Sequence, residues 1–530
     1  MSVRLPVFPL APASGDGADL ERLATRLFNA DDLKTEQLDD RVVARSGSIV
    51  LELDRSSGGI WAADEKRLWN ASETPSLVPE ERVYGVAGEL LGGLDVLPRF
   101  DEDAPFALMQ VGLGGTHVAT RSNGHSARRR LDVQARYGVA VRNPGVEGAP
   151  DLLPVVGGGG KFTLTLGDEG RPVAYYGLWR PAGEAEIVEA LDASDAEARF
   201  AALMNGVEVA DARSFLAYYA APFSADQPLL TPVYVFSAGI VVDGKELPAR
   251  LVTIPATELG PQPPESKPQP PRYGQPGRLG ALAPRRGARA INPFEAGTSW
   301  IGLSGGLAGS QANAQGFVDG LAADGWNVNF NWGDGNAWES DWRRNDDTWV
   351  DAADFVFYTG HADMNGWVLA SPDDGSLTFT EVGGAPATPG DLWGQQDLEW
   401  MIIAACGPLQ DELLAAGGGD VLARWDGAFD GLHTLMGYGA ITFDNTEEGK
   451  RIVKYSKQGT PLIDAWFRTA QEIQPSTNGA GAPDGPDVWV GAMWVAKAGA
   501  DPRSDHLWGH GSVSPDPTSP TVLACMWTTC

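Results

Sequence analysis

Two short apolar segments each lead directly to a side chain capable of nucleophilic chemistry. Residues 355–360 (Phe-Val-Phe-Tyr-Thr-Gly) lead to His361, and residues 400–405 (Trp-Met-Ile-Ile-Ala-Ala) lead to Cys406. A continuous apolar run ended by Gly or Pro is typical of a strand buried on both faces of a sheet. Because the carboxyl ends of parallel strands meet at one edge, we expect His361 and Cys406 to lie together there. An imidazole base beside a thiol activates a cysteine nucleophile.

This pairing predicts covalent hydrolysis of an acyl group. Cys406 would be the nucleophile, and His361 would be the base that deprotonates it and the acid that protonates the leaving group. The oxyanion of the intermediate requires backbone N–H donors, and we expect them from Cys406 and from Gly360, Ala362 and Gly407. The pattern identifies no third residue that would orient His361.

Residues 404–407 read Ala-Ala-Cys-Gly, and His361 lies 45 positions before Cys406. This arrangement resembles the caspase-like superfamily of cysteine peptidases (caspases, legumains and gingipains). In that family a strand ending in His-Gly precedes a strand ending in Ala-Cys, by about 50 residues in caspases. Ala362 stands where the family has Gly, which departs from its pattern. The resemblance implies a cysteine endopeptidase acting on a protein or peptide, with neither a metal nor another cofactor.

The second half of the chain, residues 291–530, alternates predicted strands with predicted helices. Strands are expected near residues 299–303, 326–330, 351–358, 399–405 and 434–443, and helices near 313–324, 409–415 and 461–471. This alternation predicts a mostly parallel sheet covered on both faces, a three-layer α/β sandwich. The caspase-like family has the same architecture. Four further motifs resemble an uncharacterised bacterial branch of that family: residues 391–394, 398–400, 428–433 and 506–511.

The first half, residues 1–256, is predicted to be an α+β region. Helices are expected at 18–29, 80–91 and 197–204, and hairpins at 48–62 and 161–178. The recurrence of a helix with antiparallel strands predicts a duplicated module. Short motifs resemble the cystatin-like PepSY-type modules found before some bacterial peptidases: residues 57–61, 153–161, 179–180 and 254–256. That resemblance implies an intramolecular regulatory region that restrains the enzyme, as in a zymogen.

Residues 257–290 are predicted to form a linker between the two halves. Residues 261–271 are rich in proline and cannot build a helix or a central strand. The segment is also basic within an acidic chain, with Arg272, Arg278, Arg285, Arg286 and Arg289. We expect it to be exposed and open to proteolysis, so that a cut there releases residues 291–530 as an active domain.

Acidic and aromatic side chains near the strand ends are the candidates for substrate binding. Four carboxylates would pair with an arginine side chain of a substrate: Asp363, Asp397, Glu399 and Asp444. Trp393, together with Trp338 and Trp342, is predicted to wall the substrate cleft, because large aromatic side chains with polar neighbours suit binding surfaces.

Two other functions remain open. A metal-dependent hydrolase would use His361, His506 and His510 as ligands, although no H-E-x-x-H or paired C-x-x-C pattern supports it. A protein that keeps the fold only for binding or assembly is the second alternative, because Ala362 replaces the family's Gly and no specificity pocket is recognisable.

Composition narrows the partners and the compartment. The chain has 530 residues and a net charge of −30, which argues against binding to nucleic acid or to an anionic membrane. The sequence contains no run of about 18 apolar residues, so no membrane-spanning helix is predicted. Three cysteines, at 406, 525 and 530, do not make a disulfide framework. The first residues make a poor signal peptide, so the expected location is the cytoplasm.

Overall fold

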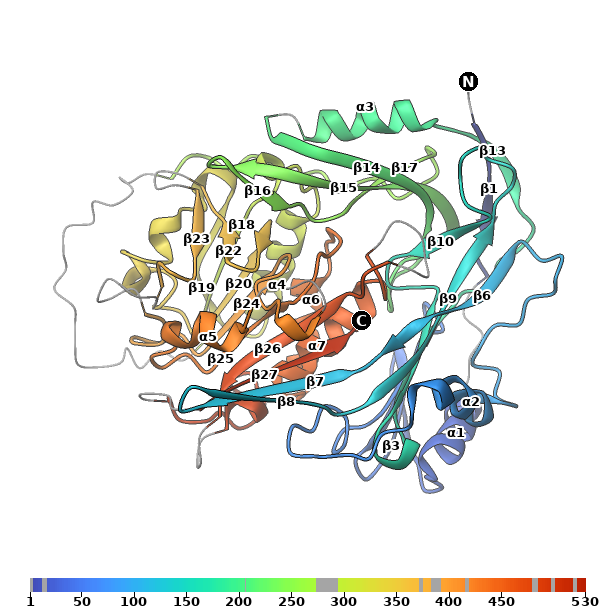
Figure 1. The fold of residues 1–530 in the computed structure, drawn as a ribbon, viewed down its shortest axis with the longest axis horizontal. Helices are drawn as coiled ribbons and strands as arrows, with labels where there is room; N and C mark the ends of the chain where they lie inside the picture. Colours follow the sequence, from blue (N-terminus) through green and yellow to red (C-terminus); the bar gives the residue numbers. More distant parts are fainter. Residues whose placement is uncertain are drawn as a thin grey trace.

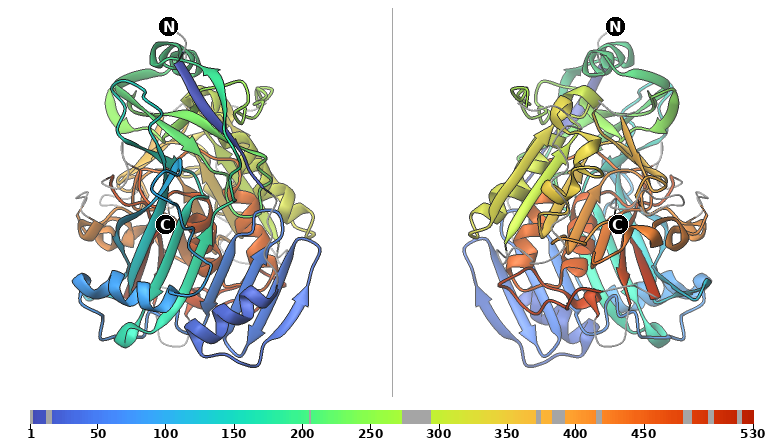
Figure 2. Two further views of the ribbon diagram at one scale, coloured as in Figure 1. Left: turned by 90° about the vertical axis from the view of Figure 1, so that its right-hand side faces the viewer. Right: turned by 90° about the vertical axis from the view of Figure 1, so that its left-hand side faces the viewer.

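The computed structural model describes residues 3–11, 17–204, 206–272, 294–370, 375–382, 392–414, 419–478, 485–496, 501–517 and 522–530. Four of the five predicted linker arginines, from Arg278 to Arg289, and Asp391 of the motif at 391–394 lie outside these ranges. Strand makes up 38% of the structure and helix 21%. Two large sheets dominate it, and helices are packed between and around them (Figures 1 and 2).

A nine-stranded mixed sheet forms the centre of the second half. Its first five strands are parallel, and its last four are antiparallel to their neighbours. In spatial order the strands are β19 Asn327–Gly333, β18 Glu295–Trp300, β20 Phe355–Thr359, β24 Trp400–Ala404, β25 Thr434–Tyr438, β26 Trp489–Val495, β27 Val522–Thr529, β7 Thr116–Ser122 and β8 His125–Arg130. The hairpin β7–β8 comes from the first half of the chain, so the two halves share one sheet (Figure 1).

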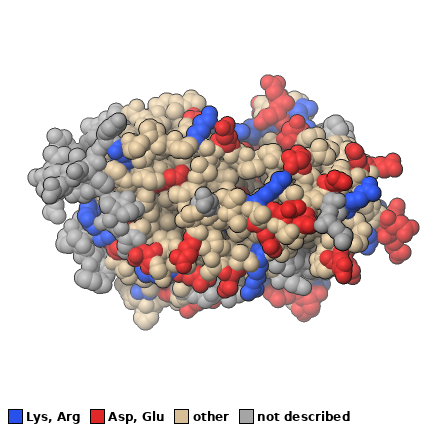
Figure 3. All heavy atoms as spheres, turned by 90° about the horizontal axis from the view of Figure 1, so that it is seen from above, with Lys and Arg blue, Asp and Glu red and all other residues tan. Residues whose placement is uncertain are grey.

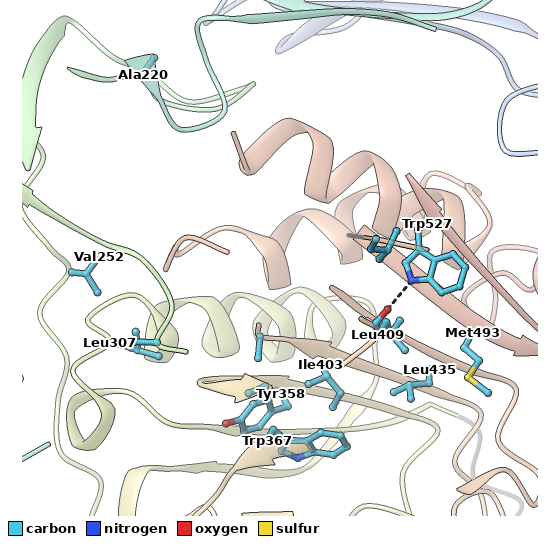
Figure 4. Close-up of a cluster of buried hydrophobic side chains, with 14 of the residues drawn as sticks. Ala220, Val252, Leu307, Tyr358, Trp367, Ile403, Leu409, Leu435, Met493 and Trp527 are labelled. Carbon is cyan, nitrogen blue, oxygen red and sulfur yellow. Dashed lines mark hydrogen bonds between the residues drawn. The ribbon is translucent and has the colours of Figure 1, made fainter. Parts of the chain in front are cut away.

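Alternate residues of the central strands point into two different cores, as a pleated sheet requires. Phe355 and Phe357 of β20 pack against Phe317 of helix α4 (Ser310–Ala322), whereas Tyr358 faces a cluster of tryptophans on the opposite face. Figure 4 shows Tyr358, Ile403 and Leu435 from neighbouring strands in a row, with Trp367 beside Tyr358. Burial on both faces explains why these strands are apolar throughout.

Helices cover one face of this sheet: α4 Ser310–Ala322, α6 Glu448–Lys457 and α7 Leu462–Ile473. The short helix α5 Val421–Trp425 lies toward the other face, with a small sheet of β21 Ala362–Asp363, β22 Gly366–Val368 and β23 Ser376–Thr378. Every residue of α7 except Asp464 is buried. The reason is that Trp466 packs against Tyr438 of the nine-stranded sheet, while Phe467 packs against Trp69 of the first half.

The first half forms a fifteen-stranded sheet that is antiparallel except for the pair β10–β14. Its main path runs β13 Glu186–Ala190, β1 Val3–Pro9, β15 Leu229–Val242, β14 Glu208–Tyr219, β10 Leu152–Val156, β9 Val133–Arg142, β11 Lys161–Leu166, β12 Pro172–Leu178, β5 Ile60–Asp64, β4 Ile49–Asp54, β3 Arg41–Ser46 and β2 Lys34–Gln37. Three strands branch from it: β6 Phe106–Gly114, β16 Lys245–Pro248 and β17 Val252–Pro255. Its helices are α1 Gly17–Leu23, continued by a π-helical turn at Ala24–Phe28, α2 Glu80–Leu91 and α3 Ala193–Leu203.

The predicted fold class was wrong. An α+β region followed by a mostly parallel α/β sandwich was expected, but the structure is mostly β, with large mixed sheets in which antiparallel pairing prevails. In the described part of the second half, parallel pairing is confined to five neighbouring strands. The error lies in the strands that were missed: the five strands predicted in the second half are the parallel ones, whereas β26, β27, β7 and β8, which were not predicted, add antiparallel pairs to the same sheet. Among the described residues, no helix combines the length and the apolar character that a membrane span requires.

Candidate active site at the carboxyl edge of the parallel strands

His361 and Cys406 follow neighbouring parallel strands in matching register. Thr359, the last residue of β20, is paired with Ala404, the last residue of β24. His361 and Cys406 each lie two residues beyond this pair. The structure therefore places both side chains on the carboxyl edge of the sheet, and both are buried.

The imidazole of His361 is held by two backbone groups. Its Nδ1 accepts a hydrogen bond of 3.2 Å from the backbone N–H of Arg250, and its Nε2 lies 2.7 Å from the carbonyl oxygen of Gly305. Because an amide N–H only donates and a carbonyl only accepts, Nδ1 is unprotonated and Nε2 carries the proton. Burial lowers the pKa of His361 to about 4; the Gly305 carbonyl opposes this shift and the charge of Arg250 adds to it. The ring is neutral, and its basic nitrogen is capped.

The thiol of Cys406 is fully buried beside Thr442. Its Sγ accepts a hydrogen bond of 3.4 Å from the backbone N–H of Thr442 and lies 3.8 Å from that residue's hydroxyl. Burial raises the pKa of Cys406, although the Arg250 guanidinium and Thr442 act in the opposite direction. The sulfur is therefore a protonated thiol at neutral pH in this arrangement.

A segment of the first half covers this edge. We call residues 249–251 the strap; it connects β16 to β17, and both of these strands pair with β15. The strap makes one parallel bridge to the second half, in which Leu251 N–H donates to Thr442 O and Asp444 N–H donates to Leu251 O, each at 2.9 Å. The same short segment thus contacts His361, through Arg250, and the Thr442 backbone that hydrogen-bonds Cys406.

The side chain of Arg250 fills a closed pocket under the strand ends. Its guanidinium donates to Ala404 O at 2.7 Å, to Phe443 O at 2.6 Å and to the hydroxyl of Thr359 at 3.1 Å. It also pairs with the carboxylate of Glu448, at 3.1 and 3.3 Å, and both side chains are 0% exposed. All these partners belong to the second half of the chain.

Glu448 is held in turn by three neutral donors. Tyr438 donates its hydroxyl at 2.6 Å, Asn313 its amide at 2.8 Å and Gln474 its amide at 3.1 Å. These donors stabilise the buried carboxylate of Glu448. A buried carboxylate of this kind requires a cationic partner, which here is the guanidinium of Arg250.

The residues predicted to form the oxyanion hole have other tasks in this arrangement. Gly407 donates its N–H to Ala440 O at 3.2 Å, and its φ of 78° explains the glycine. Ala362 is buried in β21 and pairs with Trp367. A Cβ on Gly360 would lie 2.2 Å from the hydroxyl oxygen of Tyr358, so only glycine fits there.

The predicted substrate-binding residues are spread over both edges of the sheet. Asp444 lies at the carboxyl edge, where it accepts from Gly309 N–H at 2.7 Å and borders a cavity of about 200 Å³. Burial raises its pKa to about 6, against the charge of Arg250. Asp363, on β21, closes the following turn by accepting from Asn365 N–H at 2.7 Å. Asp397 and Glu399 precede β24 and so lie at the opposite edge from Cys406.

Two of the three tryptophans of the predicted aromatic wall, Trp342 and Trp393, are core instead, whereas Trp338 is partly exposed. Trp393 is 0% exposed, donates its indole N–H to Trp342 O and packs against Trp342, Trp367 and Trp425. Apolar packing around the hydrogen-bonded indole explains why it does not line a cleft.

The three histidines of the metal alternative are not brought together. His510 lies 2.8 Å from Asp324, just after α4 and before β19, which is the amino edge of the sheet. His506 contacts the backbone of Ser512. Among the described residues, two groups have a spacing suited to a metal ion, and both are purely acidic: Glu295, Asp354 and Asp397, and Asp346, Asp347 and Asp351.

Three groups at this site were missed in the sequence: the carbonyl of Gly305, Arg250 and Glu448. Gly305 orients His361 through its backbone, so no side-chain type marks it. Arg250 and Glu448 are nearly 200 positions apart, and neither stands in a recognisable motif. Their meeting depends on the docking of one half of the chain on the other.

Comparisons with known proteins add family information for the second half. Residues 290–529 match the model of a family described as a domain of unknown function, DUF6345. No curated protein matches the chain. One similar solved structure is the crystal structure of an uncharacterized protein from Eubacterium rectale, with 13% identity and a TM-score of 0.27, covering 49% of this chain and 85% of that one.

Proposed function

We propose that this chain is a cysteine peptidase in which the strap holds the catalytic pair in a closed, resting state. One observation carries the proposal: His361 and Cys406 follow neighbouring parallel strands in register, and one segment of the first half contacts both His361 and the Thr442 backbone that hydrogen-bonds Cys406. A peptide lying across a thiol and a histidine in this way occupies the place of a substrate.

The chemistry follows from removal of the strap. The Nδ1 of His361 then becomes free to accept the Cys406 proton, while Gly305 O keeps the ring oriented. Sγ attacks the carbonyl carbon of the substrate, and the peptide C–N bond breaks as His361 passes the proton to the leaving amine. Water then hydrolyses the thioester, releasing a carboxylate and restoring the thiol. No group beyond water and peptide is consumed.

The test uses a variant with a loosened strap. Leu251→Pro removes the N–H that donates to Thr442 O, and so detaches the strap without altering either member of the pair. Incubation with a mixture of peptidyl electrophiles that acylate or alkylate thiols, followed by mass mapping, should show modification at Cys406 only. His361→Ala in the same background should abolish it.

Cys525→Ala provides the matched control, because Cys525 is also 0% exposed but lies within β27, away from His361. This variant should be labelled as fast as its parent. Equal labelling of Cys406 with and without His361, and no peptide hydrolysis in the loosened variant, would refute the peptidase. Such a result would favour the non-catalytic alternative, in which the two residues only support the contact between the halves.

A further inference from the structure

The pocket that holds Arg250 has the chemistry of a specificity pocket for a guanidinium group. Its wall supplies two backbone carbonyls, one hydroxyl and one carboxylate, all aimed at the two terminal nitrogens of a single side chain. Five short polar contacts are shared between the two terminal nitrogens of the guanidinium, a fork that the single ammonium nitrogen of lysine does not offer. The pocket lies under the ends of β20 and β24, where the guanidinium contacts Thr359 and Ala404, two residues before His361 and Cys406.

The main chain of the strap is also presented like a substrate. The N–H of Arg250 points to His361, and the next residue, Leu251, pairs with the chain at 442–444 next to Cys406. The two ends of the strap continue into β16 and β17, which are both fixed to β15. A loop clamped on both sides can fill a site without leaving it, because the two chain ends cannot separate.

From these contacts we infer that the enzyme cleaves before arginine, and that Arg250 is a built-in pseudosubstrate occupying the pocket for the residue after the scissile bond, whose N–H faces His361. The inference rests on the proposed peptidase and names its substrate class: peptides with an arginine side chain that replaces Arg250 beside Glu448. The same pocket in its emptied form binds arginine whether or not Cys406 reacts.

The first test measures binding alone. Arg250→Ala leaves Glu448 without its cation, and N-acetylarginine amide should refill the pocket. The ligand should raise the melting temperature of Arg250→Ala and leave the wild-type chain unaffected. N-acetylcitrulline amide has nearly the same shape without the charge and should give no rise. Equal effects of the two ligands, or an equal effect on the wild type, would overturn the pocket assignment.

Arg136→Ala is the matched control for loss of an interface arginine. Arg136 is also 1% exposed, and it joins the halves through Asp487 and Ser476 O, away from Cys406. Its melting temperature should fall, but N-acetylarginine amide should not restore it. If Arg250→Ala fails to fold, Arg250→Met keeps the volume of the stem and allows the same comparison.

The second test measures specificity. Internally quenched peptides that differ only in the residue after the scissile bond (Arg, Lys, citrulline or Leu) should be hydrolysed by the double variant Arg250→Ala/Leu251→Pro, which empties the pocket and detaches the strap. Its kcat/KM for Arg should be on the order of 100-fold above that for citrulline. Glu448→Gln in this background should reduce that ratio. Hydrolysis that prefers Leu or another residue would overturn the arginine pocket and leave the peptidase standing. Arginine binding without any hydrolysis would refute the peptidase and leave the pocket standing.

Discussion

At the residue scale, the candidate site is defined by what the strap does to two titrating groups. His361 is kept neutral and Cys406 is kept protonated because both are buried and their free lone pairs are used by backbone N–H groups. A protonated thiol and a neutral imidazole whose basic nitrogen is already hydrogen-bonded do not react as nucleophile and base. The same two residues become a reactive pair only when water and substrate can reach them.

The first prediction concerns pH and His361. The pKa of His361 falls from 6.5 to about 4 on folding, so between these values the unfolded chain binds a proton that the folded chain refuses. The free energy of unfolding contributed by this residue is therefore complete above pH 6.5 and is lost as the pH falls toward 4. The loss amounts to roughly 3 kcal/mol. His361→Gln keeps an acceptor for Arg250 and a donor for Gly305, and should remove that dependence.

Measurement of the denaturant midpoint between pH 7.5 and 4 checks the prediction, with wild type and variant compared at each pH. His117→Gln is the control for a second histidine, since burial also lowers the pKa of His117 to about 4. Both variants should reduce the dependence of the denaturant midpoint on pH by similar amounts. Acidic groups with raised pKa, such as Asp132, give the opposite slope and cancel in the difference. An unchanged slope in His361→Gln would mean that His361 is already protonated in the fold.

The second prediction concerns thiol access. All three cysteines are buried, so none should react rapidly with iodoacetamide in the native chain. The double variant Arg250→Ala/Leu251→Pro should accelerate alkylation of Cys406 at least about tenfold, because the guanidinium and the strap no longer cover it, while Cys525 and Cys530 stay unreactive. Peptide mapping after timed quenching measures the three rates separately. A parallel rise at all three would indicate general unfolding and would contradict a local strap.

At the element scale, the sequence predicted local structure well and sheet pairing poorly. The helix at Glu80–Leu91 begins and ends where predicted, because Glu80 and Glu81 lie in its first turn and Val83, Ala87 and Leu91 form its buried stripe. The hairpins β4–β5 and β11–β12 are also confirmed, since their turns and alternation are local. The helix expected at 409–415 is only a 3₁₀ turn at Glu412–Leu414 in the part that is described.

The pairings that were missed join segments far apart in the chain. β27 follows β7 by some 400 residues. β7 and β8 are rich in polar residues, so their sequences do not predict that they pair with a buried strand. For the candidate site, the two apolar strands predicted that His361 and Cys406 share one edge of the sheet. Nothing in the sequence predicted that Arg250 lies at the same edge. A buried arginine can be predicted from a sequence only when its carboxylate partner is close to it along the chain. Glu448 is nearly 200 positions away from Arg250.

The third prediction tests the β7–β8 hairpin as a structural part of the second half. Val118 of β7 is 1% exposed and packs in the core that also contains α7 and β27. Val118→Asp should lower the free energy of unfolding by at least about 3 kcal/mol, because it buries an unpaired charge. Ser122→Asp, at the exposed end of the same strand, should change it by less than about 0.5 kcal/mol. Urea titration followed by tryptophan fluorescence reports on the second half, where most tryptophans lie. A fluorescence midpoint unaffected by Val118→Asp would show that the hairpin is dispensable there.

At the scale of the whole molecule, an acidic surface surrounds a contact rich in arginine. The net charge is −30, and Figure 3 shows acidic side chains spread along one face with fewer basic ones among them. Several of the buried arginines instead join the halves: Arg136 with Asp487, Arg250 with Glu448, and Arg468 with Glu52. Buried pairs are little screened by salt, so this contact should persist at high ionic strength.

The segment expected to be a free linker is also anchored where it is described. Arg272 stacks on Trp332 and Trp338, with its guanidinium 4.2 and 4.0 Å from the ring centroids, and pairs with Asp341. Gln269 bonds Asn331 O and Gly333 N–H. Residues up to 272 are thus fixed to the second half on their own account, although most of those at 261–271 are exposed to solvent.

The fourth prediction follows from these contacts and concerns proteolytic activation. A recognition site for a specific protease, inserted between residues 280 and 281, would allow the chain to be cut without touching the described structure. After cutting, the two fragments should still elute together in size-exclusion chromatography, at both low and high salt, and separate only in denaturant. Three contacts between the halves do not depend on the chain that connects them: the shared nine-stranded sheet, the packing of α7 against Trp69, and the pocket that holds Arg250. The cut chain should therefore be no more active than the intact one, whereas Leu251→Pro, which detaches the strap, should be active whether cut or not. Fragments that separate in native buffer, with a gain in peptide hydrolysis, would show instead that the linker holds the enzyme closed.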